Sequence, residues 1–442
     1  MVSNFATAPP AESSNIEEGV TKIMSSARIV AIALTLMQIP AVACAADWPQ
    51  WLGPDRNGIS PETGLLKTWP KEGPKLKWKS TELGGVGYSS LAVAKGFIYV
   101  LGAFGDDEHV VALDEKDGKK LWSTKIGKIG RYEGRPEYPG PRSTPTIDGD
   151  KLYALGSAGD LVCVDAINGN VIWRKSLPDD FGGKAGMWAY SESPLVDGDL
   201  VVLSPGGEAA TIVALNKKDG MTAWKSAVPG GDRAAYGSPI CAETGGVKQY
   251  VCFLHNGLVG VAASDGKFLW RYKEVSHSFG PNMTTPLFHN GLVFGTAGLG
   301  SKGGGTVKLT ADKDKVTATE VWFNDQLKAE ICGFLRVGDH LYGTPRTARL
   351  VCAEFATGKI IWRDAAVGKG ALCVADGLLY VRGENGTVAL VEPSPAGYKE
   401  LGRFDQPDRS KKPAWPYPVV ANGCLYLRDC GVLLCYDIRS AG

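Results

Sequence analysis

Tryptophan recurs along this chain at a nearly constant interval, and that spacing limits the possible folds more than any other feature. The residues are Trp78, Trp122, Trp173, Trp224, Trp270, Trp322 and Trp362, and Phe404 continues the series in a similar context. The mean interval is about 47 residues, which is the size of one four-stranded blade of a β-propeller. We therefore expect one small β-sheet to repeat along the chain, with each large ring packed between neighbouring sheets.

Each period contains the same order of short apolar runs and tight turns. In the second period, residues 143–147, 151–156, 161–165 and the run around Trp173 would form strands A to D. Asp148-Gly149 separates the first two runs and Asn168-Gly169 the last two. These dipeptides favour two-residue hairpin turns, because such turns need a positive φ. The pattern predicts four antiparallel strands in each blade.

The number of periods predicts eight blades and a closed ring. The A-B-C units start near Tyr88, Arg142, Tyr190, Tyr236, Asn282, Cys332, Lys369 and Trp415. The last unit ends without a fourth strand, whereas the run around Trp78 is a D-type strand with no A, B or C strand before it. Pairing the two would remove the open edges of the ring. The predicted fold class is therefore all-β, an eight-bladed β-propeller of four-stranded antiparallel blades closed by an N-terminal strand, in one domain over residues 47–442.

The first 46 residues are expected to be a leader outside the fold. After Met24 come a positive charge at Arg28, an apolar run over residues 29–39 and small residues up to position 46, the order of a secretory signal peptide. The run is too short to span a membrane. We therefore predict a signal peptide at about residues 24–46 and a periplasmic or secreted protein, with Met1 or Met24 as the start. Lipid anchoring through Cys44 is an alternative, although Ala41 stands where a lipobox has Leu.

Composition argues against several classes of partner and site. Lys and Arg total 48 against 47 Asp and Glu, so no net basic field favours nucleic acid. The chain has no CxxC pair and no HExxH motif, which argues against a zinc site. Cys163, Cys352 and Cys435 occupy the place that Ala112 has in strand C, so we interpret them as small buried core residues. A monomer is expected.

The repeat resembles that of the pyrroloquinoline quinone dehydrogenases. The motif ALD-x-x-x-G-x-x-x-W at residues 112–122 returns in variant form at 163–173 and 214–224, and ADWPQWLGPDRNGISPETG at 46–64 resembles the opening of exported bacterial quinone-repeat propellers. The similarity covers nearly all of residues 47–442. The family includes quinoprotein dehydrogenases and also scaffold proteins that bind no quinone, such as the lipoprotein subunit of the outer-membrane β-barrel assembly machine. The fold therefore does not decide the function.

Polar and aromatic residues gather where A strands start and where B strands lead into C strands, the places that line the channel mouth of a propeller. The predicted cofactor-binding residues are Arg142, Trp188, Tyr190, Tyr236, Lys369, Arg382 and Arg428. The resemblance implies Ca²⁺ held by Glu192 and Asn282, with Glu330 as the base and Arg346 near the quinone oxygens. Glu330 stands where the family has Asp, and the adjacent cysteines of many alcohol-oxidising members are absent.

Two functions remain open at this stage. The main hypothesis is an exported binding or scaffold propeller that takes a protein, peptide, glycan or small molecule at its channel mouth and rim. The alternative is a dehydrogenase that depends on pyrroloquinoline quinone and Ca²⁺ and oxidises an alcohol or a sugar. Whether the chain is an enzyme is not decided by its sequence.

Overall fold

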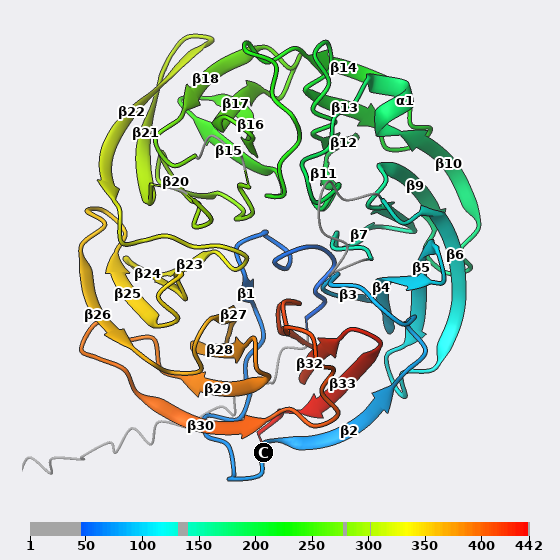
Figure 1. The fold of residues 1–442 in the computed structure, drawn as a ribbon, viewed down its shortest axis with the longest axis vertical. Coiled ribbons are helices and arrows are strands. Elements are labelled where there is room, and N and C mark those ends of the chain that lie inside the picture. The colour runs from blue at the N-terminus through cyan, green and yellow to red at the C-terminus, as the bar shows by residue number, and fades with distance from the viewer. Residues whose placement is uncertain (1–45, 131–139, 277–280, 301, 441–442) are drawn as a thin grey trace, which may run out of the picture. The chain divides into compact units, whose positions relative to one another are not determined.

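The computed structural model describes residues 46–130, 140–276, 281–300 and 302–440, and these residues form eight β-sheets arranged in a ring (Figure 1). The predicted eight-bladed propeller is confirmed. The leader, including Cys44 and nearly all of the proposed signal peptide, lies outside the described residues and stays a prediction. Among the described helices, none has the length and apolar character that crossing a membrane requires.

Blades 1 to 4 follow one another along the chain, each with the strand order A-B-C-D. Blade 1 consists of β3 (Ala92–Ala94), β4 (Phe97–Phe104), β5 (Asp107–Asp114) and β6 (Lys120–Lys128). Blade 2 consists of β7 (Thr146–Asp148), β8 (Lys151–Leu155), β9 (Asp160–Asp165) and β10 (Val171–Ser176), and it is followed by α1 (Leu177–Phe181). Blade 3 consists of β11 (Leu195–Asp197), β12 (Leu200–Leu203), β13 (Ile212–Asn216) and β14 (Thr222–Ser226). Blade 4 consists of β15 (Ile240–Thr244), β16 (Val247–Leu254), β17 (Gly257–Ala262) and β18 (Phe268–Tyr272).

Blades 5 to 8 complete the ring with the same order. Blade 5 consists of β19 (Leu287–His289), β20 (Leu292–Thr296), β21 (Gly304–Asp312) and β22 (Lys315–Asn324). Blade 6 consists of β23 (Phe334–Val337), β24 (His340–Gly343), β25 (Leu350–Glu354) and β26 (Ile360–Asp364). Blade 7 consists of β27 (Gly370–Ala375), β28 (Leu378–Gly383), β29 (Thr387–Val391) and β30 (Glu400–Asp405), with β1 (Ile59–Ser60) added beside β27. Blade 8 consists of β31 (Val419–Ala421), β32 (Cys424–Asp429), β33 (Val432–Asp437) and β2 (Lys75–Ser80).

The N-terminal strand closes the ring as predicted. β2 pairs antiparallel with β33, and Trp78 lies opposite Cys435 in that register. Blade 8 therefore takes three strands from the C-terminal end of the chain and its outermost strand from the N-terminal part. This arrangement covers the outer edge of β33, which would otherwise be an open template for strand pairing.

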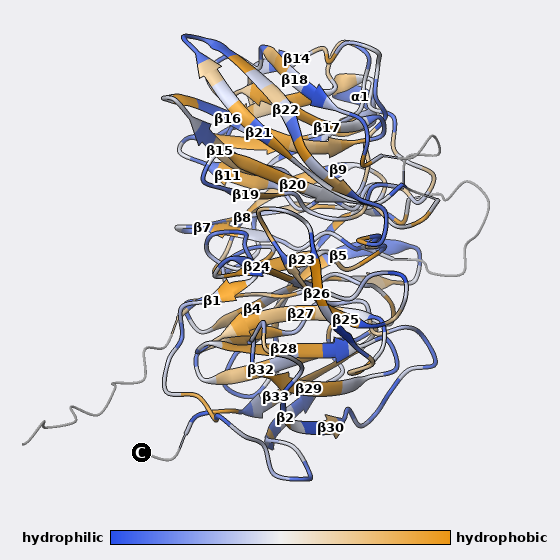
Figure 2. Cartoon of the chain, turned by 90° about the vertical axis from the view of Figure 1, so that its left-hand side faces the viewer, coloured by the Kyte–Doolittle hydropathy of each residue, from blue (hydrophilic) through white to orange (hydrophobic). Residues whose placement is uncertain are grey.

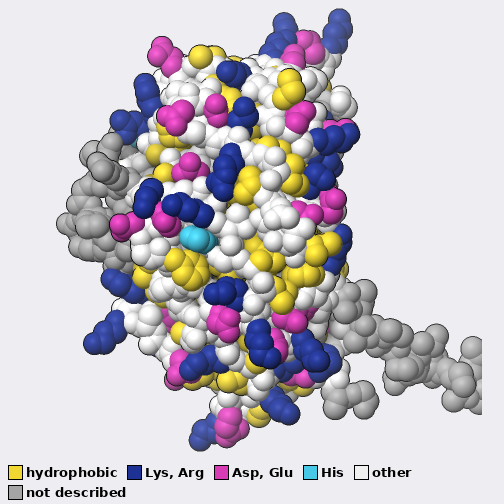
Figure 3. All heavy atoms as spheres, turned by 90° about the vertical axis from the view of Figure 1, so that its right-hand side faces the viewer, with side chains coloured by type: hydrophobic (Ala, Val, Ile, Leu, Met, Phe, Trp, Pro, Cys, Tyr) yellow, Lys and Arg dark blue, Asp and Glu magenta, His cyan; other side chains and the backbone are white. Residues whose placement is uncertain are grey.

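Apolar residues lie mainly on the middle strands of the blades (Figure 2), and buried apolar clusters join neighbouring blades. One such cluster joins Val202 and Ala214 of blade 3 to Cys252 and Val259 of blade 4. Strands B and C are nearly continuous buried runs, whereas the outer D strands alternate between buried and exposed residues. The outer face in Figure 3 carries Lys and Arg intermixed with Asp and Glu, without a large area of one sign.

The tryptophans pack between blades as predicted. The Trp78 ring lies against Gly118 in the C-D turn of the next blade, and a Cβ placed on that glycine would come within 2.7 Å of the ring. The indole Nε1 of Trp78 donates to the Glu115 carbonyl oxygen at 3.1 Å. Equivalent bonds to the following blade come from Trp173, Trp224, Trp322 and Trp362. For Trp78, Trp173, Trp224 and Trp322, the contact joins one blade to the next through a ring, a glycine and one hydrogen bond.

The interpretation of Phe404 as the eighth ring of the series is wrong by two residues. In blade 7, Gly402 lies opposite Leu390 beside the β-bulge, the place that Trp122 has opposite Ala112 in blade 1. Trp69, from the N-terminal part of the chain, packs against Gly402 and lies 5.4 Å from the Phe404 ring, between ring centroids. The missing tryptophan of blade 7 is thus supplied from a distant part of the sequence.

Candidate functional site

Residues 46–60, which we call the channel segment, run through the centre of the ring (Figure 1). The segment contacts the inner strands of several blades by backbone bonds: Trp48 exchanges two of 2.8 Å with Val93 of blade 1, and Pro49 accepts one from Ile147 of blade 2. At its C-terminal end, β1 pairs in parallel with β27 of blade 7. The channel segment therefore ties together blades that are not neighbours.

Arg56 fixes the middle of the channel segment. Its guanidinium is buried and donates to the carbonyl oxygens of Ser193 and Pro194, both at 2.8 Å, and to the side chain of Gln50 at 3.1 Å. Burial lowers the pKa of Arg56 to about 10, against the opposing attraction of nearby groups that include Glu192. A buried guanidinium with this many partners holds the segment in one position.

A pocket lies on each side of the channel segment. The pocket at the starts of the A strands, which we call the mouth pocket, has a volume of about 430 Å³. The second pocket is lined by residues of the A strands themselves and has a volume of about 460 Å³. Its wall includes Arg56, Asn57, His289 and Arg336. Trp51 belongs to the mouth pocket, so the channel segment forms part of both walls.

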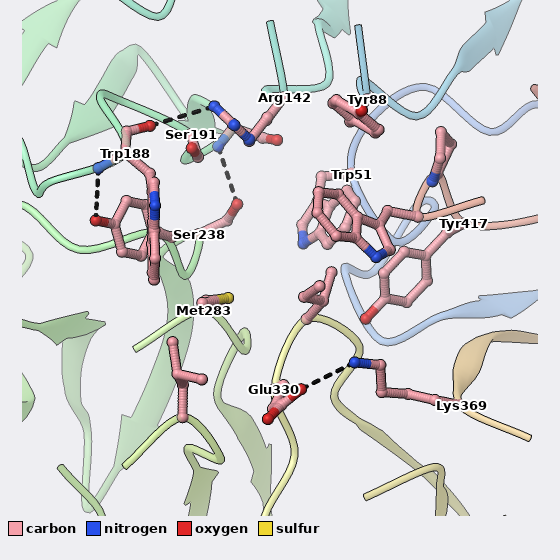
Figure 4. A pocket seen from close by; sticks show the side chains of 16 residues that line it. Trp51, Tyr88, Arg142, Trp188, Ser191, Ser238, Met283, Glu330, Lys369 and Tyr417 are labelled. Atoms are coloured by element: carbon pink, nitrogen blue, oxygen red, sulfur yellow. Dashed lines mark hydrogen bonds and ion pairs between the residues drawn. The ribbon is translucent and has the colours of Figure 1, made fainter. Parts of the chain in front are cut away.

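Aromatic side chains dominate the wall of the mouth pocket (Figure 4). The residues that line it are Trp51, Tyr88, Arg142, Trp188, Ser191, Ser193, Tyr236, Ser238, Met283, Leu299, Glu330, Ile331, Lys369, Trp415, Pro416 and Tyr417. Six of these are aromatic, and they come from the channel segment and from the loops that lead into strands A. An aromatic wall with a few polar groups is the usual composition of a binding pocket in a protein.

The rings occur in pairs. Tyr88 and Trp415 have centroids 4.9 Å apart, and Trp51 meets Tyr417 edge to face at 4.8 Å. The Trp51 indole also donates to the Thr285 hydroxyl at 2.8 Å. The third pair, Trp188 and Tyr236, has centroids 5.7 Å apart, and the Tyr236 hydroxyl accepts a bond of 3.1 Å from the Trp188 backbone N–H. The wall is therefore largely fixed before any ligand arrives.

The charged groups of the mouth pocket neutralise one another. Glu330 places one carboxylate oxygen 2.9 Å from Lys369 Nζ and the other 3.1 Å from Arg346 Nε. Lys369 also lies 3.3 Å from a carboxylate oxygen of Glu384, whose same oxygen accepts a 2.7 Å bond from the Trp415 indole. Burial alone would lower the pKa of Lys369, but its bond to Glu330 and the charges of both carboxylates raise it. The lysine therefore stays an ammonium.

Five of the predicted site residues line the mouth pocket: Arg142, Trp188, Tyr236, Glu330 and Lys369. Arg346 is brought to the same place through its ion pair with Glu330. Arg142 donates to the Trp188 carbonyl oxygen at 3.2 Å and lies 5.9 Å from the centre of the Tyr88 ring. The sequence therefore identified part of the pocket wall. The roles of these residues as cofactor ligands or catalytic groups stay predictions.

Tyr190, Arg382 and Arg428 lie behind the wall. Tyr190 is buried, and its hydroxyl donates to the Pro205 carbonyl oxygen at 2.9 Å. Arg382 and Arg428 lie within strands β28 and β32 rather than in B-C loops, which corrects that part of the prediction.

The two arginines support the wall instead of lining it. Arg382 donates to the Pro416 carbonyl oxygen at 3.1 Å, and Arg428 donates to the Ser89 carbonyl oxygen at 2.8 Å. Burial lowers the pKa of each to about 10. Because Pro416 lines the pocket and Ser89 follows Tyr88, these bonds hold the loops that carry Tyr88, Trp415 and Tyr417.

The side chains of Glu192 and Asn282, the predicted Ca²⁺ ligands, do not line the mouth pocket. Glu192 accepts a bond of 2.5 Å from the Ser204 backbone N–H, and burial raises its pKa to about 7. Asn282 Nδ2 donates to the carbonyl oxygens of Leu254 and His255 at 2.6 and 3.1 Å. Within the described residues, no group of three or more His, Cys, Asp or Glu side chains could hold a metal ion. The roles of Glu192 and Asn282 as Ca²⁺ ligands therefore stay predictions.

Sequence reasoning missed the contribution of Trp51, Trp415 and Tyr417. Trp51 lies in the WPQW stretch of the channel segment, outside the repeat, so no blade position could be assigned to it. Trp415 marked the start of the last A-B-C unit and was therefore available as a candidate by position. Its ring partner in the pocket is Tyr88, which lies more than 300 residues away in the chain.

Comparison with known proteins places the fold and the repeat in a known group. A family model described as outer membrane protein assembly factor BamB matches residues 62–187, 106–309 and 303–394. The outer membrane protein assembly factor BamB of Yersinia pestis is 23% identical over 375 residues, which cover 78% of this chain and 85% of that protein. The protein of the same name from Shewanella oneidensis is 26% identical over 255 residues, which cover 54% of this chain and 60% of that protein.

Solved structures agree on the fold. The crystal structure of BamB from Moraxella catarrhalis superposes with a TM-score of 0.52 at 15% identity, covering 76% of this chain and 96% of that one. The computationally designed Ika8 protein superposes with a TM-score of 0.54 at 9% identity, covering 82% and 100%. Since the family model matches well over half of the sequence, this chain belongs to the family of pyrroloquinoline-quinone-repeat β-propellers that the model describes as outer membrane protein assembly factor BamB.

Proposed function

We propose that this chain is a non-catalytic binding propeller, and that it holds a protein partner by taking an apolar or aromatic side chain of that partner into the mouth pocket. The observation that carries the proposal is the wall itself, in which six aromatic residues surround a volume of about 430 Å³. Pockets of this kind bury anchor side chains well, because aromatic rings offer a large apolar area at a low cost in conformational entropy.

The charges around the pocket support binding rather than catalysis. Both carboxylate oxygens of Glu330 face cations, Lys369 and Arg346, so neither is left to act as a general base without breaking an ion pair. Arg142 is likewise committed to the Trp188 carbonyl oxygen. These pairs give the pocket polar edges of both signs, which favour register and specificity in a partner rather than bond chemistry.

The names of the relatives favour a protein as the partner. The matched relatives from Yersinia pestis and Shewanella oneidensis are named outer membrane protein assembly factors. A strand of an outer-membrane protein alternates apolar and polar residues and ends in aromatic girdles. Such a segment would offer aromatic side chains to the mouth pocket one at a time.

The test is a fluorescence titration of the full chain, because Trp51, Trp188 and Trp415 line the pocket. The probe is a blocked peptide that alternates Phe or Tyr with Ser or Thr, compared with a peptide of the same composition in which the aromatics are adjacent. We expect micromolar binding of the alternating peptide. The variant Trp415→Ala should weaken it by about tenfold or more, which corresponds to about 1.4 kcal/mol.

The control variant is Phe323→Ala, since Phe323 is a large aromatic residue exposed on the outer strand β22. Its affinity for the peptide should equal that of the unchanged protein. A parallel titration uses pyrroloquinoline quinone with and without Ca²⁺. Tight, Ca²⁺-dependent binding of the quinone together with no binding of either peptide would overturn the proposal in favour of the dehydrogenase.

A further inference from the structure

Blade 8 holds two cysteines on the same face of one pair of strands. In the register of β32 and β33, Cys424 lies opposite Asp437 and Cys435 lies opposite Tyr426, so the two cysteines are diagonal neighbours. Residues in this relation share a face of the sheet. Both cysteine side chains are buried, and each thiol shifts the pKa of the other, which places the two groups beside one another. Both are free thiols.

A lysine is directed at the same sulfur. The ammonium of Lys77 lies 3.4 Å from Cys424 Sγ. Lys77 falls in the register shift of β2 between Leu76 and Trp78, and a bulge of this kind re-aims the side chain of the extra residue. Because Lys77 itself is exposed, the sulfur that it contacts lies directly beneath the surface.

The surroundings favour the thiolate form of Cys424. The bond from the Cys435 thiol is the largest influence, and the ammonium of Lys77 adds to it, so the pKa of Cys424 falls below its ordinary value although burial opposes the shift. Arg439 lies on the same side, while Tyr426 donates to Glu115 at 2.9 Å. A thiolate next to a second thiol is the arrangement of a redox-sensitive cysteine pair.

Blades 2 and 6 show what is particular to blade 8. Cys163 lies opposite Tyr153 and Cys352 lies opposite Tyr342, just as Cys435 lies opposite Tyr426. The position of Cys424, however, is occupied by Lys151 in blade 2 and by His340 in blade 6.

The lone thiols behave as ordinary core residues. Burial raises the pKa of Cys163 to about 12 and also raises that of Cys352. A single cysteine in strand C is thus a small buried side chain, as the sequence suggested. Only blade 8, among the described blades with a cysteine in strand C, adds a second sulfur and a cation.

We propose that Cys424 and Cys435 form a peroxide-sensitive dithiol that closes to a disulfide across β32 and β33. The Cys424 thiolate attacks one oxygen of hydrogen peroxide, so that an S–O bond forms, the O–O bond breaks, and the departing hydroxide takes up a proton to become water. The sulfur of Cys435 then attacks the resulting sulfenic acid, the S–S bond forms, and the second oxygen leaves as water with the proton of the Cys435 thiol. In sum, two thiols and one peroxide give one disulfide and two waters; the sulfur pair loses two electrons and the peroxide gains them.

A small oxidant suits this site because both sulfurs are buried and the exposed Lys77 side chain lies against Cys424. Cys424 would be the attacking residue, since its thiolate is stabilised. Cys435 would be the resolving residue, since it lies on the same face of the strand pair as its diagonal neighbour. None of Lys77, Cys424 and Cys435 lines the mouth pocket, so the two sites share no residue. The proposal is independent of the binding function.

The experiment treats the full chain with increasing hydrogen peroxide and then digests it without reductant. Mass spectrometry should detect the peptides of Cys424 and Cys435 joined, with the loss of two hydrogens, before Cys163 or Cys352 is modified. In the variant Cys435→Ser, dimedone should instead label Cys424 as a trapped sulfenic acid. Cys163→Ser is the matched control and should leave the joined peptide unchanged.

The surface variant Lys77→Met guards against a loss of folding in the buried serine variants. It should slow formation of the joined peptide at neutral pH several-fold, because a smaller fraction of Cys424 is then thiolate, and Lys77→Arg should restore most of the rate. Oxidation of Cys163 as fast as Cys424, or an unchanged rate in Lys77→Met, would overturn the proposal.

Discussion

The outer tryptophan contacts and the channel segment hold the ring together in opposite ways. At the rim, the same contact is repeated with little change: Trp78 lies against Gly118, Trp122 against Gly169 and Trp173 against Gly220 of the following blade. Each joins two neighbours in sequence. In the channel, residues 46–60 bind inner strands of separate blades, and no two of these contacts are alike.

The difference separates the features that the blades share from those that are particular to this protein. Repeated contacts set the number of blades and their spacing, and a blade can be recognised by them without reference to the rest of the chain. The channel segment sets which side chains face the two pockets, because Trp51 forms part of the mouth pocket and Arg56 part of the other. Blade number is thus a property of the rim, whereas the site is a property of the channel.

The largest effect is expected from removing Arg56, the central contact of the channel segment. The variant Arg56→Met should lower the free energy of unfolding by about 3 to 5 kcal/mol, because it leaves two buried carbonyl oxygens without their donor and removes the positive charge near Glu192. Chemical unfolding followed by circular dichroism measures the change.

Arg439→Met is the matched control. Arg439 is also paired with a carboxylate, that of Asp437, but it is 56% exposed, so its loss should cost no more than about 1 kcal/mol. Similar losses in the two variants would show that the channel segment is not a special fixing point of the ring.

The second prediction concerns the pH dependence of stability that comes from Glu192, a buried carboxyl group near Arg56 of the channel segment. Burial raises the pKa of Glu192 from 4.5 to about 7, so folding favours its protonated form. The stabilisation from this group is complete below pH 4.5 and is lost as the pH rises through 7. The full loss is about 3 kcal/mol, at 1.36 kcal/mol per pKa unit. Glu192→Gln should therefore flatten the fall in stability between pH 5 and pH 8, measured by urea unfolding at both values.

Glu108 provides the comparison for that experiment. It is also buried, and its pKa is raised to about 6. Its shift is smaller than that of Glu192, so Glu108→Gln should flatten the same curve by a smaller amount. A wild-type slope that survives in Glu192→Gln would contradict the assignment of the titration to Glu192.

The fold could be predicted because its signals are local and repeated. The turn dipeptides, the apolar runs and the tryptophan spacing act within one period, and each period confirms the next. Even the closing strand followed, since the run around Trp78 had no blade of its own. The error at Phe404 has the same origin, because this ring fits the repeat spacing in blade 7. The ring that replaces the tryptophan there is Trp69, which the spacing cannot identify because it lies far away in the sequence.

The site could be predicted only in part because its contacts are long in sequence and occur once. Position at a strand start identified Arg142, Tyr236 and Lys369 as pocket residues. It could not tell a side chain that faces the pocket from one that supports it, as Arg428 does through the Ser89 carbonyl oxygen. Nor could any repeat place Trp51, since the channel segment has no counterpart elsewhere in the chain.

The smallest effect is expected from substitutions of two turn glycines, one of which packs against a rim tryptophan. Gly118 and Gly149 both have positive φ, +73° and +63°, so alanine at either place carries the strain of a left-handed conformation, about 1 kcal/mol. A Cβ at Gly149 meets nothing within 4 Å, whereas one at Gly118 lies 2.7 Å from the Trp78 ring and must displace it. Gly118→Ala should therefore lose about 1 to 2 kcal/mol more than Gly149→Ala in chemical unfolding. Equal losses would mean that the tryptophan can move aside freely, and the rim would then owe its stability to the strand pairing of the blades rather than to the repeated ring and glycine contact.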